Sequence, residues 1–365
     1  MNVRGVTLQA GLAVVGLVAA FFVWQREPEG MPGEVTVLDV SKRALQRIRY
    51  DDATRSVELY RDASDEDTVW VRLGEKPPPP PAPKPTATDG GVGDGGVPGT
   101  GADGGVGAPT GGADAGTPAA PPPPPPPREL RGNETARNFF ARLAPLKATR
   151  ALGELDAKKQ EELGLTNSPR KLTLTVDGRE HAFVLATPSG NSWGSPYLRR
   201  DDGRVFLLGP TVLPDLEGAS SRLVDRRMHA FEQGEYDAFT VTQGKNSRAF
   251  VVSGKPPAPV TVAPQGAPDK PDEFARNWHD RVWRLLPMDF VGRGDEPPGG
   301  APEEVFRVEY KLGAKVVGHV IVARGDKGDF FARTEHTPGW AKLHTGVDTL
   351  ATEAAKVASG AASGG

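Results

Sequence analysis

The chain of 365 residues contains no cysteine. This absence excludes disulfide bonds, metal sites built on thiolates, catalysis by a cysteine nucleophile and lipid attachment to a cysteine. Any chemistry of the chain must therefore use other side chains.

Net charge is also small, with 44 Lys and Arg against 47 Asp and Glu. The formal charge of −3 equals that of one stretch rich in proline and glycine, where Lys84 stands against Asp89, Asp94, Asp103 and Asp114. The rest of the chain is near neutral and lacks the dense basic patch of nucleic-acid-binding domains. We therefore expect no nucleic-acid partner and no polybasic attachment to a membrane surface.

Motifs of nucleotide-binding and hydrolytic enzymes are scarce. The sequence has no P-loop, and no Rossmann glycine pattern follows a predicted strand. Residues 190–194 fit G-x-S-x-G, which in hydrolases places a serine, here Ser192, on a strand-to-helix turn. Here the pentapeptide joins two predicted strands and has prolines on both sides, which favours a plain loop. We therefore predict no catalytic residue, no cofactor and no enzymatic activity, with a hydrolase using Ser192 or a histidine as the alternative.

The six histidines form no HxH or HExxH pattern: His181, His229, His279, His319, His336 and His344. His336 and His344 flank the turn of a predicted hairpin, and Glu335 is adjacent, so two imidazoles and a carboxylate are available for a metal ion. Solvated histidines at strand ends are the commoner arrangement. We predict the latter and no metal site.

One long apolar run lies near the start of the chain. Residues 6–24 contain no charged side chain and as a helix extend roughly 28 Å, about the thickness of a hydrocarbon core. We predict a transmembrane helix in the lipid bilayer, with residues 1–5 in the cytoplasm because Arg4 precedes the run. The alternative is a cleaved signal peptide with its cleavage site near residues 18–20.

Proline and glycine are concentrated in one region. Residues 77–127 contain 17 prolines and 13 glycines, which is 30 of 51 residues. Such a segment buries too little apolar surface to offset its chain entropy, so we predict a disordered insertion over 76–128. Its polyproline blocks suit docking into aromatic grooves or a tether, but a tolerated loop insertion is the simpler interpretation.

An internal repeat organises the remainder. The sequence ARNF at 136–139 recurs as ARNW at 275–278, an offset of 139. Both segments have apolar residues three and four apart and read as amphipathic helices, with Asn133 and Asp272 as N-caps. We infer two copies of one unit.

Each copy also carries predicted hairpins. Alternating apolar residues around turns predict strand pairs at 172–185 and 197–208 in the first copy and at 306–322 and 330–343 in the second. Further strands are predicted upstream of each long helix, and a helix closes each copy, at 213–221 and 347–359. The fold class is therefore α+β. The predicted boundaries are 34–74 and 129–235 for the first repeat unit, 236–359 for the second and 360–365 for a disordered tail.

Three arginines near the end of the first unit form a candidate interaction site: Arg222, Arg226 and Arg227. They suit an anion or a partner protein, but a linker helix over 223–231 that joins the two units with a solvated charged face is the favoured interpretation. The tryptophans Trp70, Trp193, Trp278, Trp283 and Trp340 are predicted to pack in the core or in loops, with a ligand platform as the alternative.

Residues 163–169, LGLTNSP, follow a short acidic helix and precede a hairpin. This segment resembles the yGLdxP signature of the domain of unknown function 4340 family, whose members are similar in their N-terminal anchor and in a Tyr-Leu-Arg strand, here 197–199. Five positions carry the likeness: Leu163, Gly164, Leu165, Asn167 and Pro169. The family's tyrosine before the glycine is absent here. Gly164 suits a helix C-cap with positive φ, and Pro169 suits the start of a strand.

The resemblance implies a single-pass envelope protein associated with ABC-type transport systems related to gliding-motility exporters. It brings no catalytic residues. We therefore expect a non-catalytic structural or accessory protein in the bacterial inner membrane, with its body in the periplasm and envelope or ABC-transporter proteins as partners. The alternative is a module that binds a solute or glycan in the cleft between the two units.

Overall fold

The structure, a computed structural model, describes residues 33–62, 65, 67–77, 124–187, 194–255, 257–344 and 346–361. The predicted transmembrane segment 6–24, most of the predicted insertion 76–128 and Ser192 lie outside these residues. No helix within the described ranges is long and apolar enough to cross a membrane.

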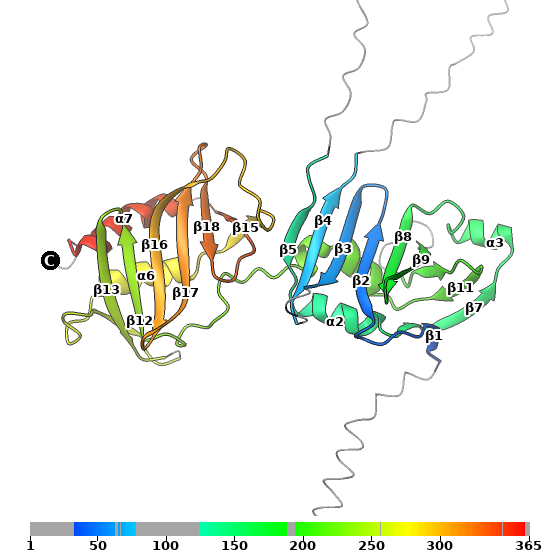
Figure 1. Ribbon diagram of the computed structural model, residues 1–365, viewed down its shortest axis with the longest axis horizontal. Coiled ribbons are helices and arrows are strands. Elements are labelled where there is room, and N and C mark those ends of the chain that lie inside the picture. The colour runs from blue at the N-terminus through cyan, green and yellow to red at the C-terminus, as the bar shows by residue number, and fades with distance from the viewer. Residues whose placement is uncertain are drawn as a thin grey trace, which may run out of the picture.

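Alternating apolar residues place one face of each strand against a layer of helices (Figure 1). Nine described strands form the first sheet, in the spatial order β5(Arg128–Arg131), β4(Val69–Glu75), β3(Arg55–Arg61), β2(Leu45–Asp51), β8(Arg170–Val176), β9(Arg179–Ala186), β10(Tyr197–Arg199), β11(Arg204–Leu207), β7(Arg150–Glu154). Its core contains side chains of α2(Glu134–Leu143), α4(Val212–Glu217) and α5(Ala219–Arg222). Two further strands, β1(Val35–Leu38) and β6(Leu146–Ala148), pair separately, and α3(Ala157–Glu162) lies beyond β7 in the chain.

The second sheet has eight described strands. Their spatial order is β14(Thr261–Pro264), β13(Asn246–Ser253), β12(Ala238–Gln243), β16(Glu303–Leu312), β17(Lys315–Arg324), β18(Phe330–Thr334), β19(Ala341–Leu343), β15(Pro287–Phe290). Its apolar face packs against α6(Glu273–Trp283) and α7(Val347–Ser359). The predicted α+β class is confirmed, with sheet outweighing helix.

The two sheets share one strand order once β5 is set aside. From β4 to β7 and from β14 to β15, each position is filled by the strand with the same rank along the chain, when only the remaining strands of each sheet are counted and the separate pair β1–β6 is left out. The helices α2 and α6 also begin alike, because Asn133 accepts from the Ala136 N–H (3.0 Å) and Asp272 from the Ala275 N–H (2.9 Å). We call β1 to α5 the first unit and β12 to α7 the second unit.

The predicted linker helix over 223–231 is wrong. The chain there is extended: the Asp225 N–H donates to the Arg131 carbonyl (2.8 Å), and Val224 bridges Gly132. These bonds satisfy the backbone against β5, and residues 223–231 contain no helix. We call residues 223–237 the connector.

Strand β5 belongs to both units. It pairs antiparallel with β4 of the first sheet, so the proline-rich insertion joins two adjacent strands. Its Leu130 (3% exposed) packs in the apolar cluster of the second unit, together with Val224 and Met228.

A loop of the second unit also contacts β5. The Arg293 N–H donates to the Glu129 carbonyl (2.8 Å), the Arg293 guanidinium lies 4.4 Å from the centre of the Trp70 ring, and Arg128 pairs with Asp289 (2.6 Å). The two units are therefore joined along this strand as well as through the connector.

Replacing Leu130 with alanine tests this junction. Leu130→Ala should lower the free energy of unfolding by about 2–4 kcal/mol, because it removes buried leucine carbons. The rate of amide hydrogen exchange, measured by mass spectrometry, should rise in both β4 and the connector. In the control Leu59→Ala, whose side chain packs in the first cluster alone, the increase should be confined to the first sheet. Exchange unchanged in the connector of Leu130→Ala would contradict the shared role of β5.

Candidate functional site

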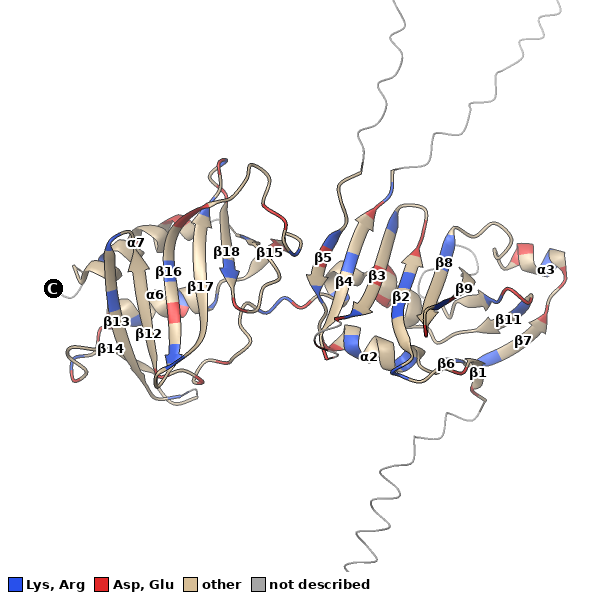
Figure 2. Ribbon diagram, in the orientation of Figure 1, with Lys and Arg blue, Asp and Glu red and all other residues tan. Residues whose placement is uncertain are grey.

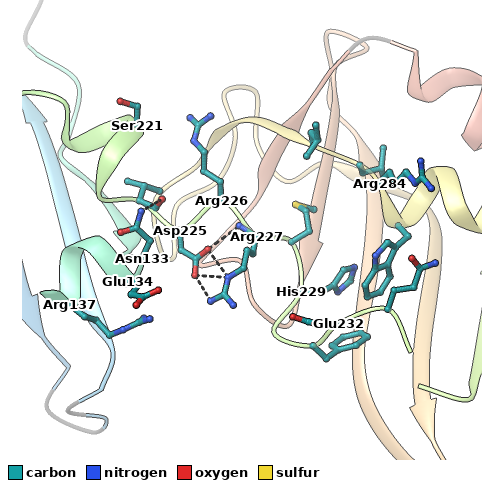
Figure 3. A pocket seen from close by; sticks show the side chains of 17 residues that line it. Asn133, Glu134, Arg137, Ser221, Asp225, Arg226, Arg227, His229, Glu232 and Arg284 are labelled. Carbon is teal, nitrogen blue, oxygen red and sulfur yellow. Dashed lines mark hydrogen bonds and ion pairs between the residues drawn. The ribbon is translucent and has the colours of Figure 1, made fainter. Parts of the chain in front are cut away.

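A cleft of about 870 Å³ lies beside the connector, between α2 of the first unit and α6 of the second (Figure 3). In Figure 3, Arg137 and Glu134 lie on one side, Arg284 lies on the other, and Arg226 and Arg227 project from the chain between them. Both charged and apolar side chains line it: Asn133, Glu134, Arg137, Ser221, Val224, Asp225, Arg226, Arg227, Met228, His229, Phe231, Glu232, Gln233, Trp283, Arg284, Leu285 and Leu286.

Glu335, at the end of β18, fixes the connector on the second unit. Its carboxylate accepts from the Ala230 N–H (3.0 Å), the His319 N–H (3.0 Å) and His229 Nδ1 (3.2 Å). Burial alone would raise the pKa of Glu335, but the hydrogen bonds from His229 and from the two backbone amides outweigh it, and the pKa is lowered. The carboxylate is therefore held as an anion that binds the connector backbone.

A second buried pair lies beside the first. His336 Nε2 is 3.0 Å from Asp225 Oδ2, Arg227 Nη2 is 2.7 Å from the same oxygen, and the Thr334 hydroxyl donates to the Met228 carbonyl. Burial opposes the charge of Asp225, but the hydrogen bonds from His336 and Arg227 prevail and hold its pKa well below the usual range. The connector is thus fixed at Asp225, Met228 and Ala230.

These pairs change the interpretation of the histidines. His336 was expected to be solvated but is buried, because it is the partner of Asp225, whereas His344 is exposed. Glu335 binds His229 and not His336. No group of three side chains suited to a metal ion occurs among the described residues.

Aromatic rings form one wall of the cleft. The Trp283 ring stacks on His229, with centroids 4.7 Å apart and planes at 7°, and its edge meets Phe231 at 5.4 Å. Tyr310 lies behind them, 5.5 Å from Trp283. Trp283 is half-buried, so part of its indole faces the cleft.

The other tryptophans lie elsewhere. Trp278 is fully buried in the second core, and Trp70 donates through Nε1 to Asp62 (2.8 Å) at the junction of the units. Trp193 is outside the described residues. Trp283 is thus the described tryptophan that lines this cleft.

His279 lies beneath the aromatic wall. Its ring stacks on Phe239 at 4.3 Å, and its Nε2 is 3.4 Å from the Tyr236 hydroxyl. Burial, together with the nearby His229, lowers the pKa of His279 to about 3, so its imidazole is neutral in the folded protein at neutral pH.

The three predicted arginines have different environments. Arg222 pairs with the buried Asp215 (2.8 Å) and does not line the cleft, and Arg227 is bound to Asp225. Arg226 lines the cleft, is exposed and has no ion pair with the described residues, and the same holds for Arg137. The prediction of a basic interaction site is thus carried by Arg226. Figure 2 shows the remaining basic residues spread over both sheets.

Two apolar side chains are exposed shortly after α6. Leu286, which lines the cleft, is 72% exposed, and Met288, two residues further along the chain, is 46% exposed. Leu312 and Val316, at the tip of the β16–β17 hairpin, are the other large apolar side chains with such exposure in the described ranges. Leu286 therefore offers the cleft an exposed apolar contact.

The motif at 163–169 lies in the first unit, apart from this cleft. Leu165 is fully buried and Leu163 is partly buried in a small cluster with Ala186 and Val205, on the side of β9 opposite the main core. Gly164 ends α3 with φ of +72°, as predicted for a C-cap. Asn167 and Pro169 are exposed. The motif holds α3 against the sheet.

Sequence reasoning gave no site role to Leu286 and considered Trp283 only in the alternative of a ligand platform. The repeat contains a signal for both, because at the offset of 139 they correspond to Ala144 and Lys147. A large aromatic ring and an apolar side chain thus replace small and charged residues at repeated positions.

Comparisons of the chain with models of known families, with curated proteins and with solved structures found no match. The resemblance to the domain of unknown function 4340 family therefore stays a prediction.

The buried imidazole of His279 predicts a pH dependence of stability. Its pKa is about 3 in the folded chain and about 6.5 when unfolded, so below pH 6.5 only the unfolded state takes up the proton. The free energy of unfolding should therefore fall by about 1.4 kcal/mol per pH unit from this group as the pH drops from 6.5 toward 3. The free energy of unfolding, measured by urea titration at several pH values, should depend less steeply on pH in His279→Phe. Its dependence on pH should be unchanged in His344→Gln, whose imidazole is exposed. Equal slopes in wild type and His279→Phe would contradict this assignment.

Proposed function

We propose that this chain is a non-catalytic accessory protein of the bacterial envelope that binds a partner protein in the connector cleft. Residues 6–24 anchor it in the inner membrane, residues 1–5 stay in the cytoplasm, and the two units stand in the periplasm. The partner belongs to an envelope assembly, with an ABC-type transport system related to gliding-motility exporters as the expected one.

One observation supports the proposal above all: beside the cleft, the connector backbone is held in place by hydrogen bonds, while a cationic and an apolar side chain remain exposed to solvent. The connector is bound through Asp225, Met228 and Ala230, so binding needs little further ordering of the chain. Arg226 and Leu286 meanwhile face solvent. A preformed site with exposed cationic and apolar groups suits recognition of a macromolecule.

The absence of enzymatic activity and of a cofactor is also part of the proposal. His229 lines the cleft and His336 pairs with Asp225 beside it, and each imidazole is bound to a carboxylate that in turn holds the connector backbone. Moving either proton would disturb the connector, which favours a structural role for both pairs.

The common strand order supports a further proposal, that the chain is a tandem duplication of one antiparallel-sheet-plus-helix unit with the insertion 76–128 in its first copy. On this basis the second unit began as a copy of the first. Differences between the units are then informative about function.

A second candidate function is binding of a solute or glycan in the same cleft. The stacked pair of Trp283 and His229 favours it, because flat aromatic faces bind sugar rings and other apolar ligand surfaces. In that case soluble ligand, and not a protein, should fill the 870 Å³ cavity.

Site-directed crosslinking tests the proposal, since a single introduced cysteine is the only thiol in the chain. We would place cysteine at Ser221 or Glu232, on the rim of the cleft, or at Ser247 on β13 as a control. Each full-length variant in native membranes would receive a thiol-reactive benzophenone and be irradiated. Both cleft positions should yield the same envelope protein by mass spectrometry, because they line one site.

Two outcomes would overturn the proposal. One is absence of protein adducts from both cleft positions. The other is an identical set of adducts from Ser221→Cys and from the Ser247→Cys control.

A further inference from the structure

The two units differ at one place where the shared strand order predicts the same structure. In the first unit, β6 directly follows α2 and pairs antiparallel with β1, which precedes β2 in the chain. Val35 pairs with Ala148 and Thr36 with Lys147. The backbone after α2 is thereby covered by a strand.

The corresponding backbone of the second unit pairs with β19 from Pro287 onward, but no described strand takes the place of β1 beside it. Residues 285–287 directly follow α6, and the connector precedes β12 as β1 precedes β2, but the two do not pair. The cleft lies between them, lined by Phe231 and His229 from the connector and by Leu285 and Leu286. The cleft therefore occupies the place of the β1–β6 pair.

The consequence is visible in burial and hydrogen bonding. Leu146 of β6 is fully buried, whereas its counterpart Leu285 is only partly buried and the next residue, Leu286, is 72% exposed. The N–H of Leu286 makes no hydrogen bond within the described part of the chain, and the next residue, Pro287, begins β15, which is the end strand of the described sheet and pairs with β19 on one edge only. The free edge of an end strand is a place to which another strand adds.

We propose that an extended segment of the partner adds as a strand along residues 285–288, in the cleft between this edge and the connector. The inference rests on the proposed function and specifies how the partner is recognised. Main-chain hydrogen bonds to the free edge of this segment hold the partner, and an apolar side chain covers Leu285 and Trp283.

The charges favour an acidic residue in the same segment. Arg226 is exposed beside the cleft and forms no ion pair within the described ranges, while its neighbours Arg222 and Arg227 each bind a carboxylate of this chain. A carboxylate from the partner would give Arg226 the same kind of ion pair. The chain's own β1 region has this chemistry, with Glu34 and Asp39 flanking the apolar residues of the strand.

The peptide GEVTVLDVSK, which copies residues 33–42, is therefore the probe. The chain has four methionines, of which Met228 lines the cleft and Met288 belongs to the segment 285–288 itself. Full-length protein labelled with [methyl-¹³C]methionine and held in detergent micelles would be titrated with the peptide. The methyl signals of Met228 and Met288 should shift saturably, while those of Met1 and Met31 should not.

Matched variants locate the binding. Leu286→Asp should lower the affinity for the peptide at least about tenfold, because it removes an apolar contact and places a carboxylate near the carboxylate of the peptide. Leu312→Asp, at a side chain of similar exposure on the β16–β17 hairpin, should leave binding unchanged. Because both side chains are exposed, neither variant should unfold the protein. A peptide with proline in place of Val37 should not bind, since it cannot complete the ladder.

Three results would overturn strand addition: no shift of the two cleft methyls, equal binding by Leu286→Asp and wild type, or equal binding of the proline peptide. Shifts of the same methyls by a soluble sugar, with none by the peptide, would also overturn it and favour the solute-binding function. Crosslinks from Ser221→Cys that persist in a Leu286→Asp background would leave the proposed function standing and reject this mode of recognition alone.

Discussion

The packing of Leu130 against the second unit is the contact on which the arrangement of this protein depends. Strand β5 completes the edge of the first sheet through β4, yet its leucine lies in the core of the second unit. The connector then adds to β5 through the Asp225 amide, and the carboxylates of Asp225 and Glu335 hold it to the end of β18 and the following turn. Without the shared strand, the cleft would have no fixed walls, because α2 and α6 belong to different units.

The two units share one strand order, so the places where they differ point to function. The first has β5 on the edge strand β4, whereas the second ends at β14, where Pro264 removes a donor and the Asp272 amide occupies the Val262 carbonyl. That edge is therefore protected against the addition of another strand. The segment after α6 is the opposite case, since it lacks the cover that β1 gives to β6 and leaves Leu286 in solvent. The proposed function follows from this one uncovered edge.

Local signals predicted most of the fold. Alternation with a DG turn predicted the β8–β9 hairpin, and Asp177 and Gly178 both adopt positive φ there. The N-caps Asn133 and Asp272 were found for the same reason, since capping depends on adjacent residues. The connector was mistaken for a helix, because its partners lie about a hundred residues away at 335 and 336. Arg226 was identified by charge alone, but the cleft beside it forms only when distant segments meet.

Strand β5 and the connector hold the two units as one body. Because the chain has no cysteine, spin labels at Glu180→Cys on β9 and Ser247→Cys on β13 report one distance across the junction. Pulsed electron–electron double resonance should give a single narrow distance distribution. A broad distribution, as from two units on a mobile tether, would contradict the account.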